Sequence, residues 1–426
     1  MMMFVIFLAL VAMVCINVPI AVALALAAVL AIFISDGGAA LVTIALDMYN
    51  GARSFSLIAI PMFVLAGAIM NATGITRRLI AFVSAVIGFV RGGLAMVNVG
   101  VSLFFAEISG SAVADVAAMG SIIIPEMKKR GYPAPFAAAI TSSSASLAII
   151  IPPSIPMILY AVAAGTSIEQ MFVAGVVPGL IGAAGLMGVA YYYAVKYNLP
   201  MEEAFNLRRL RTTFVEALPT FSLPVIILGG IFGGFVTATE GAGIAVVAAI
   251  LVGIWYREVD WGQLKQAMLE GGIQTAVVML LVAASILIGS YLTQARVPQQ
   301  LAEGILDITS NQYLILLILN VFFLVIGFFL HSAAAIILVV PVIVPLIQQA
   351  GIDPVHFGLV VTLNLAIGQQ TPPVASVLIT ACSIAKANIW EVSKANLPFV
   401  GVLLFVLLLC TYVPAVPMFL VEYFYR

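Results

Sequence analysis

Residues 140–162 read ITSSSASLAIIIPPSIPMILYAV, a run of hydroxyl side chains that leads into two prolines within an uncharged segment. Proline donates no backbone hydrogen bond and restricts the residue before it. A helix that reaches Pro152 and Pro153 must therefore break and leave carbonyl groups free. Residues 362–382 read TLNLAIGQQTPPVASVLITAC and repeat the pattern. The sequence thus predicts two helices that are broken at matching points.

The composition identifies the surroundings of these helices as lipid. Apolar residues make up 64% of the 426 positions and charged residues only 8%, whereas a soluble domain carries about 25% charged residues. We therefore expect an all-α polytopic membrane protein. The apolar start, residues 1–10, lacks the basic region of a signal peptide and is expected to remain as a membrane helix. With a net charge of −1, the chain lacks the excess of basic residues that is typical of nucleic-acid-binding proteins.

The chain contains an internal repeat. Pro125 and Pro345 are 220 positions apart, and so are Gly131 and Gly351 and the two double prolines. Prolines that merely mark separate turns would not share a single offset, so these matches indicate a repeat. The first repeat is predicted at 1–212, with an arm at 40–53, a hairpin at 94–127, a broken helix at 134–164 and a helix at 171–195 before a cytoplasmic linker. The second is predicted at 213–426, with an arm at 258–273, a hairpin at 312–347, a broken helix at 356–385 and a C-terminal helix.

The basic residues predict that the two repeats are inverted. Lys128-Lys129-Arg130 aligns with the neutral Gln348-Gln349-Ala350. Because basic residues concentrate on the cytoplasmic side, the matched ends should lie on opposite sides of the membrane, with both termini periplasmic. Each hairpin helix is too short to span comfortably. We therefore expect re-entrant hairpins that turn at Ser109–Ser111 and at Gly327–Ser332.

The hairpin tips and helix breaks are candidate Na⁺ sites, because free carbonyls and hydroxyls supply the oxygen ligands that a hard cation prefers. Two such sites are expected. The alternative, that these small residues only permit close helix packing, stays open. The first site would use Ser109, Gly110, Ser111, Ser144 and Ser146, and the second Gly327, Thr362, Gly368 and Thr371.

Polar groups at membrane depth are candidates for substrate binding. Glu107 and Asp115 flank the first tip, where they could instead cap hairpin amides, and His331 at the second tip could be a satisfied buried histidine. Glu240 lies in a turn, where a carboxylate costs little free energy. No Ser/His/Asp set and no GxxxxGK[ST] phosphate loop occurs in the sequence. The candidate substrate contacts are Asp115, Ser154, His331, Asn364 and Gln370.

These motifs carry a resemblance to a known family. The stretches 109–115 (SGSAVAD) and 125–131 (PEMKKRG) resemble the signature of the large membrane subunit of tripartite ATP-independent periplasmic (TRAP) transporters. Ser154, Thr239-Glu240 and Gln370-Thr371-Pro372-Pro373 are similar to its other motifs, and the resemblance covers essentially the whole chain. Gly241 and Gly243 stand where the family usually has alanines.

The resemblance implies a Na⁺-driven elevator in the bacterial inner membrane that takes up an organic anion, often a sialic acid or a C4-dicarboxylate. It also implies two partners, a periplasmic substrate-binding protein and a small TRAP membrane subunit, which we expect on a separate chain. The arms would then link a mobile transport domain to its scaffold.

Other functions are weighed against this one. A stand-alone Na⁺/carboxylate symporter of related fold would need no small subunit. An intramembrane enzyme using Asp115 or His331 would need a second catalytic group, and none is evident. An ion channel fits re-entrant hairpins in inverted repeats less well than alternating access does.

Overall fold

The computed structural model describes residues 9, 12, 13, 16, 18–37, 42, 44–201, 204–258 and 260–425, without the side chains of Asp36, Gln263 and residues 107–109. The predicted membrane segment 1–10 and the start of the arm at residue 40 fall almost wholly outside this part. Within it, eight helices are long and apolar enough to cross a membrane. They include both helices of the second hairpin, Gln312–Phe329 and Ser332–Gln349, so the expectation that each hairpin helix is too short to span is wrong for that hairpin. The predicted fold class, an all-α polytopic protein with two inverted repeats, re-entrant hairpins and broken helices, is confirmed.

The first half of the chain supplies a short arm, a hairpin and a broken helix. The hairpin turns between α6 and α7, and a π-helical segment at Val116–Gly120 joins α7 to α8. The helices are α2 (Ile20–Asp36), α3 (Ile44–Ala52), α4 (Ala59–Ala72), α5 (Ile75–Ile87), α6 (Gly93–Ser109), α7 (Ala112–Asp115), α8 (Ser121–Lys129), α9 (Ala134–Ala145), α10 (Ile155–Ala164) and α11 (Ile168–Lys196), with a 3₁₀ turn η2 (Phe55–Ile58) before α4.

The second half repeats this order. Its first break helix begins at Pro354, 220 positions after Ala134. The helices are α12 (Leu207–Phe232), α13 (Ala238–Trp255), α14 (Trp261–Gln294), α15 (Val297–Leu306), α16 (Gln312–Phe329), α17 (Ser332–Gln349), α18 (Pro354–Gly368), α19 (Ser376–Ala385), α20 (Ile389–Tyr412) and α21 (Ala415–Tyr425).

Two predicted boundaries fall inside continuous helices. The division between residues 212 and 213 lies within α12, so the boundaries of the repeats stay a prediction. The arm predicted at 258–273 is not a separate element, because α14 runs unbroken from Trp261 to Gln294. No proline interrupts this stretch, so the helix continues through it.

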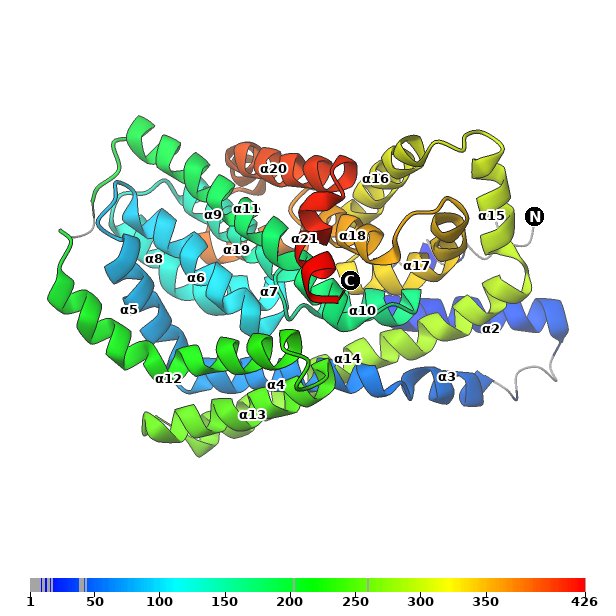
Figure 1. The fold of residues 1–426 in the computed structure, drawn as a ribbon, viewed down its shortest axis with the longest axis horizontal. Helices are drawn as coiled ribbons and strands as arrows, with labels where there is room; N and C mark the ends of the chain where they lie inside the picture. The colour runs from blue at the N-terminus through cyan, green and yellow to red at the C-terminus, as the bar shows by residue number, and fades with distance from the viewer. Residues whose placement is uncertain are drawn as a thin grey trace.

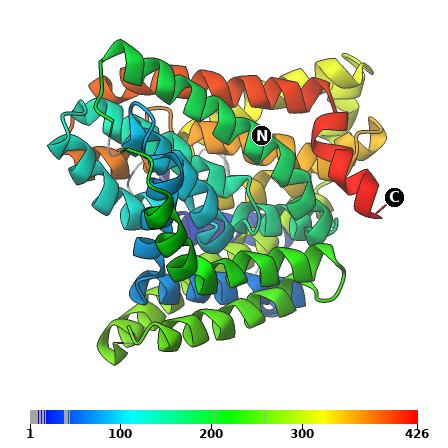
Figure 2. The same ribbon diagram turned by 60° about the vertical axis from the view of Figure 1, so that its left-hand side comes forward.

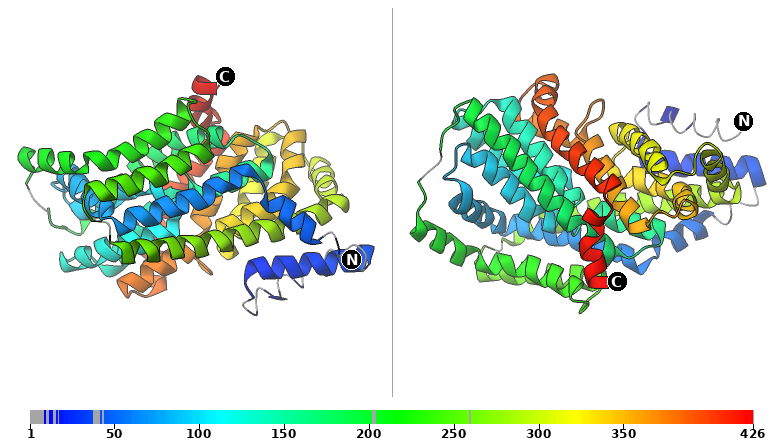
Figure 3. Two further views of the ribbon diagram at one scale, coloured as in Figure 1. Left: turned by 90° about the horizontal axis from the view of Figure 1, so that it is seen from below. Right: turned by 45° about the horizontal axis from the view of Figure 1, so that its top comes forward.

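The helices form two layers. Helices α3, α4, α12, α13 and α14 lie along one edge of the molecule, and the hairpins and broken helices occupy the rest (Figures 1 and 2). The view from below shows the first group as neighbouring, roughly aligned rods (Figure 3). Within this layer, α4 and α13 pack together, and α14 packs on α2, α3 and α4. We refer to α2–α4 and α12–α14 as the scaffold layer and to α6–α11 and α16–α20 as the hairpin layer.

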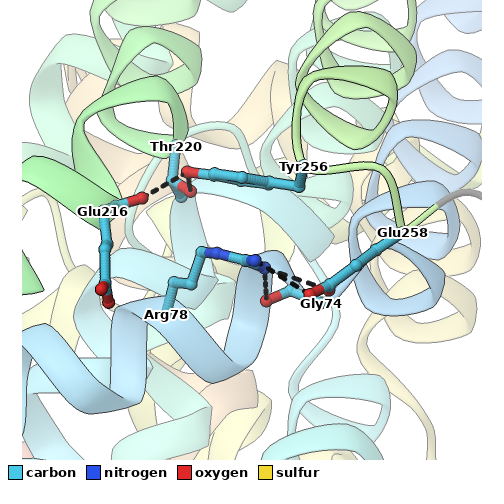
Figure 4. A network of polar contacts seen from close by, with 6 residues as sticks. All are labelled: Gly74, Arg78, Glu216, Thr220, Tyr256 and Glu258. Carbon is cyan, nitrogen blue, oxygen red and sulfur yellow. Dashed lines mark hydrogen bonds and ion pairs between the residues drawn. The ribbon is translucent and has the colours of Figure 1, made fainter.

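A polar cluster ties α5, which connects the two layers, to the scaffold layer (Figure 4). Arg78 donates two hydrogen bonds to the Glu258 carboxylate, at 2.9 and 3.0 Å. Its guanidinium also lies 3.8 Å from the centroid of the Tyr256 ring. The Tyr256 hydroxyl donates to the carbonyl oxygen of Glu216 on α12, at 2.7 Å. The cluster therefore joins α5 to the body of α12 and to the C-terminal end of α13. In the second repeat, Pro298 takes the place of Arg78.

Candidate functional site

The tip of the first hairpin lies against the break of the same repeat. Helix α6 ends at Gly110, whose φ of 58° favours glycine. The Gly110 carbonyl accepts a hydrogen bond from the backbone N–H of Ile155, at 3.4 Å. A Cβ atom at this position would lie 2.9 Å from the carbonyl oxygen of Pro153. Glycine thus allows the turn and the close approach of the two segments.

The break itself separates α9 from α10 at the predicted place. A 3₁₀ segment, Ser146–Ile149, follows α9, and α10 begins after the two prolines. Ser154 joins the two sides, because its hydroxyl donates to the Ile149 carbonyl at 2.7 Å and accepts from the backbone N–H of Met157 at 3.5 Å. The side chains of Thr141 to Ser146 are all buried. A polar run is thus enclosed beside backbone that is not helical.

The second tip meets the second break in the same manner. The Phe328 carbonyl accepts a hydrogen bond from the backbone N–H of Val374, at 3.2 Å. A Cβ atom on Gly368 would lie 2.5 Å from backbone atoms of Gly327. His331 begins α17, and its Nδ1 accepts from the backbone N–H of Ala333 at 3.4 Å. The residue is exposed, while its ring is part-buried where it caps the start of α17, so both interpretations of His331 stay predictions.

The helix that follows each break also contacts the other repeat. Helix α10 packs against α17, the returning arm of the second hairpin, and α19 packs against α7, α8 and the π-helical segment of the first. Lys128 at the end of α8 donates to the carbonyl oxygen of Ala385, at 2.7 Å, which is a favourable place for a cation at the end of α19. Each half-helix after a break therefore rests on the hairpin of the other repeat.

Several predicted ion ligands keep their oxygen lone pairs available. Ser146 donates its hydroxyl proton to the Ser142 carbonyl, Thr362 to the Leu359 carbonyl and Thr371 to the Ile367 carbonyl, at 2.9 to 3.1 Å. Each hydroxyl proton is donated to a helix carbonyl, so the lone pairs of the hydroxyl oxygen remain available to accept a hydrogen bond or to coordinate a cation. These three hydroxyls suit a cation.

Ser144 occupies a different environment. It takes part in a buried network with Ser102 and Asn98 on α6. Asn364, 220 positions later, donates to Asn320 on α16 at 2.7 Å. Matched positions in the two repeats thus bind the broken helix to the first arm of the hairpin. The side chain of Ser109 lies outside the described set, and Gly110 and Ser111 form the tip as predicted.

Four buried polar atoms near the breaks have no hydrogen-bond partner among the described residues. Leaving such an atom unpaired costs about 1–3 kcal/mol, so each is a candidate for contact with a ligand or water. Two are oxygens, which suit a cation, and two are amide nitrogens, which suit an anion. They are Ser142 Oγ, Asn364 Oδ1, Gln369 Nε2 and Gln370 Nε2.

A contact between the repeats, which the sequence did not predict, surrounds Gln370. Its Oε1 accepts hydrogen bonds from Ser143 on α9, at 2.7 Å, and from the Asn396 amide on α20, at 3.1 Å. Asn396 is 1% exposed on α20, three and five residues after Ser393 and Glu391, so its sequence neighbours gave no signal that its amide would be buried. The cluster leaves the Gln370 amide nitrogen as the free end of the side chain.

Of the three carboxylates that the sequence singled out, the side chain of Glu107 lies outside the described residues, and the other two lie in different layers. Asp115 is fully buried at the end of α7, beside the first tip. Glu240 forms a capping box with Thr237 at the start of α13 in the scaffold layer, which agrees with its interpretation as a turn carboxylate. Glu240 is therefore part of the structural framework.

Comparison with known proteins identifies related chains. A family model described as "Tripartite ATP-independent periplasmic transporter, DctM component" matches residues 6–416. The C4-dicarboxylate TRAP transporter large permease protein DctM of Pseudomonas aeruginosa is 38% identical over 375 residues, 88% of each chain. The isethionate TRAP transporter permease protein DctMQ of Oleidesulfovibrio alaskensis is 39% identical over 95% of this chain, which spans 64% of that relative.

A solved structure shares the fold. The YdaH transporter of Alcanivorax borkumensis superposes with a TM-score of 0.64 at 14% identity, and the match covers 89% of both chains.

Proposed function

Because this chain belongs to the DctM component family of tripartite ATP-independent periplasmic transporters, we propose that it carries a small organic anion across the bacterial inner membrane together with Na⁺. The observation that carries the proposal is the pair of tip-to-break junctions. Each junction gathers backbone carbonyls and hydroxyl lone pairs beside buried polar atoms that lack a protein partner. A group of oxygen ligands of this kind suits Na⁺.

The Na⁺ ions are cargo in this proposal, bound at one site in each repeat. The first site would use Ser109, Gly110, Ser111, Ser144 and Ser146, with Ser142 as an additional oxygen. The second would use Gly327, Thr362, Gly368 and Thr371, with Asn364 Oδ1 alongside. Binding there would offset the partial negative charge of the carbonyls. Movement of the bound ions down their gradient would supply the energy for uptake.

The substrate anion would meet amide donors near the second break. The unpaired Nε2 atoms of Gln369 and Gln370 are neutral donors suited to a carboxylate or sulfonate, and the exposed His331 lies on the adjoining tip. Ser154 already donates once and accepts once, and an ionised carboxylate at Asp115 would repel an anion. We therefore propose that Ser154 and Asp115 lie next to the substrate site and maintain its structure, and that they do not contact the substrate.

The names of the relatives suggest the class of substrate. C4-dicarboxylates and isethionate are small, water-soluble organic anions, and a sialic acid belongs to the same broad class. We propose a substrate of this kind, delivered by a periplasmic binding protein to a complex that includes a small membrane subunit. Both termini would lie on the periplasmic side.

Movement would follow an elevator mechanism. The hairpin layer would slide as one body along the scaffold layer, since each break rests on its own tip and on the opposite hairpin. Interlocked packing of this kind favours rigid-body motion over internal rearrangement.

Reconstitution tests the proposal. The chain is placed in vesicles with a candidate small subunit, binding protein and radiolabelled organic anions. We expect uptake that requires both partners and an inward Na⁺ gradient, and that stops when K⁺ replaces Na⁺. Robust uptake by the chain alone would favour the stand-alone symporter, and uptake without Na⁺ would contradict the ion sites.

A further inference from the structure

A groove of about 390 Å³ lies between α5 and the first turns of α12. Leu207 and Phe214 in its lining are 69% and 45% exposed, so the groove opens at the surface of the protein. The surface of a membrane-spanning chain meets lipid at such apolar side chains. The apolar walls come from positions about one helical turn apart on each helix, namely Phe82 and Val86 on α5 and Leu207, Leu210 and Phe214 on α12.

One end of this groove is positively charged. Arg211 belongs to the lining, and Arg208 lies one turn earlier on a neighbouring part of the same helix surface. Both side chains are exposed, and neither forms an ion pair within the described part of the chain. The first turn of α12 carries no acidic residue. Two acids precede this helix in the sequence, Glu202 and Glu203, and they lie outside the described residues.

The other end of the groove rests on aromatic rings. The ring centroids of Phe82 and Phe214 are 5.9 Å apart, and Phe82 lies 4.9 Å from Phe221. Phe221 in turn lies 5.7 Å from Phe104 on α6, the first helix of the first hairpin. The groove therefore combines a cationic end with an apolar end, and the apolar end connects through packed rings to the hairpin layer.

The position of α5 relative to the membrane follows from its length and its charges. It contains 13 residues, about 20 Å of helix, which is too short for a hydrocarbon core of about 30 Å. Arg77 and Arg78 lie near its start and Arg91 just after its end. The backbone N–H of Gly92 donates to the Pro200 carbonyl at 3.1 Å, so the end of α5 lies beside the linker that precedes α12. Basic residues at both ends predict the cytoplasmic side, where the membrane surface is negatively charged.

From these observations we propose that the groove binds a phospholipid with a net negative headgroup, whose phosphate contacts Arg208 and Arg211 and whose acyl chain lies along Phe82 and Phe214. A free phosphate would leave the apolar walls uncovered, and a lipid without net charge would leave the two arginines without a compensating charge. The inference requires that the chain lies in a membrane, and it is independent of the substrate and of the proposed ion sites.

Native mass spectrometry of the purified chain tests the lipid site directly. The protein in detergent micelles is titrated with phosphatidylglycerol, and separately with phosphatidylcholine, which has no net charge. Arg211→Gln removes the charge from the groove. Lys265→Gln is the matched control, because Lys265 is an exposed basic residue on α14 that does not line the groove.

We expect phosphatidylglycerol to bind roughly fivefold more weakly to Arg211→Gln than to wild type, the effect of one basic residue at an anionic surface. Lys265→Gln should bind it as wild type does. Equal affinity for wild type and Arg211→Gln would overturn the proposal. So would equal binding of phosphatidylcholine, because the arginines would then contribute no selectivity.

A second pair of variants tests the apolar part of the groove. Val86→Trp fills the groove and leaves both arginines in place, so it should lose most of the phosphatidylglycerol binding. Val247→Trp, at an exposed position on α13, should retain it. Unchanged binding to Val86→Trp would overturn the acyl-chain contact and indicate a headgroup held by surface charge alone.

Thermal unfolding distinguishes the lipid from an acidic partner within the chain, such as Glu202 or Glu203. Added phosphatidylglycerol should raise the unfolding midpoint of wild type and raise that of Arg211→Gln less. Equal destabilisation of Arg211→Gln with and without this lipid would overturn the proposal in favour of an internal ion pair. Normal elution on size-exclusion chromatography checks folding, and Arg208→Gln serves as a second variant if Arg211→Gln does not fold.

Discussion

At the scale of single residues, the candidate ion sites depend on how each hydroxyl uses its proton. Ser146 and Thr371 both donate to a carbonyl of the preceding helical turn, which leaves lone pairs for a cation. Ser144 instead belongs to a network with α6, so its oxygen is less available. The geometry therefore ranks Ser146 and Thr371 above Ser144 as ion ligands.

Removing one of these oxygens should weaken Na⁺ dependence without unfolding the protein. Thr371→Val keeps the shape of the side chain, and Ser146→Ala removes one hydroxyl at the other site. Each loss costs on the order of 1–3 kcal/mol, which is roughly tenfold or more in Na⁺ affinity. Uptake measured against Na⁺ concentration should shift accordingly, and Val246→Ala on α13 serves as the control. If neither variant shifts the curve while transport continues, the side-chain assignments are wrong.

At the scale of elements, the close approach of tip to break in the second repeat depends on glycine. Gly368 meets the backbone of Gly327, which cannot turn aside as a flexible side chain can. Both tips also receive backbone hydrogen bonds across the junction. The junction therefore behaves as one packed unit.

Gly368→Ala should destabilise this unit. The added Cβ atom would lie 2.5 Å from Gly327 backbone atoms, and overpacking of a tight core costs about 1–3 kcal/mol. Thermal unfolding in detergent should show a lower midpoint. Gly401→Ala on α20 is the matched control, because its Cβ atom has nothing within 4 Å. A lowered midpoint in both variants, or in neither, would contradict this account of the junction.

The cluster around Arg78 gives a second prediction at this scale. Arg78→Ala removes a bidentate ion pair and a cation–π contact, which together contribute about 1 kcal/mol at a partly exposed position. Arg78→Lys keeps the charge but loses the paired geometry. The unfolding midpoint should fall for alanine and fall less for lysine. Equal midpoints for wild type and Arg78→Ala would mean that the cluster adds nothing to stability.

The pH dependence of this ion pair follows from Glu258. The hydrogen bonds from Arg78 lower the pKa of the Glu258 carboxyl below its ordinary value of 4.5. A lowered pKa means that the stabilisation is present above the unfolded value and is lost as the pH falls through the folded value. The difference between wild type and Arg78→Ala should therefore persist at neutral pH and disappear in acid below about 4.5.

At the scale of the whole molecule, two repeats interlock into one hairpin layer beside a scaffold layer. The contact of Gln370 with Ser143 and Asn396 joins the repeats at the centre of that layer. The orientation of the repeats in the membrane follows from the basic residues at one set of ends. It determines from which side of the membrane each hairpin enters.

Surface labelling checks this orientation. A cysteine at Lys129 should react with an impermeant reagent only from the cytoplasmic side, and one at Gln349 only from the periplasmic side. The matched ends differ because the first is basic and the second neutral. Sealed vesicles of known orientation provide the measurement. Labelling of both positions from one side would contradict the predicted orientation.

The sequence by itself determined the features that depend on nearby residues. Double prolines break helices wherever they occur, glycine and serine permit sharp turns, and a shared offset of 220 positions indicates a repeat. These signals predicted that the fold contains hairpins and broken helices. The scarcity of charge predicted the membrane.

Only the tertiary structure decided what depends on packing between distant segments. It brought each tip onto its own break, each half-helix onto the other hairpin, and Asn396 onto Gln370. It also made the second arm the beginning of a single helix, α14, and separated Glu240 from the hairpins. The pattern along one helix indicates which of its residues are polar or buried. It does not indicate which helix will cover them, because many pairings of apolar faces bury similar areas.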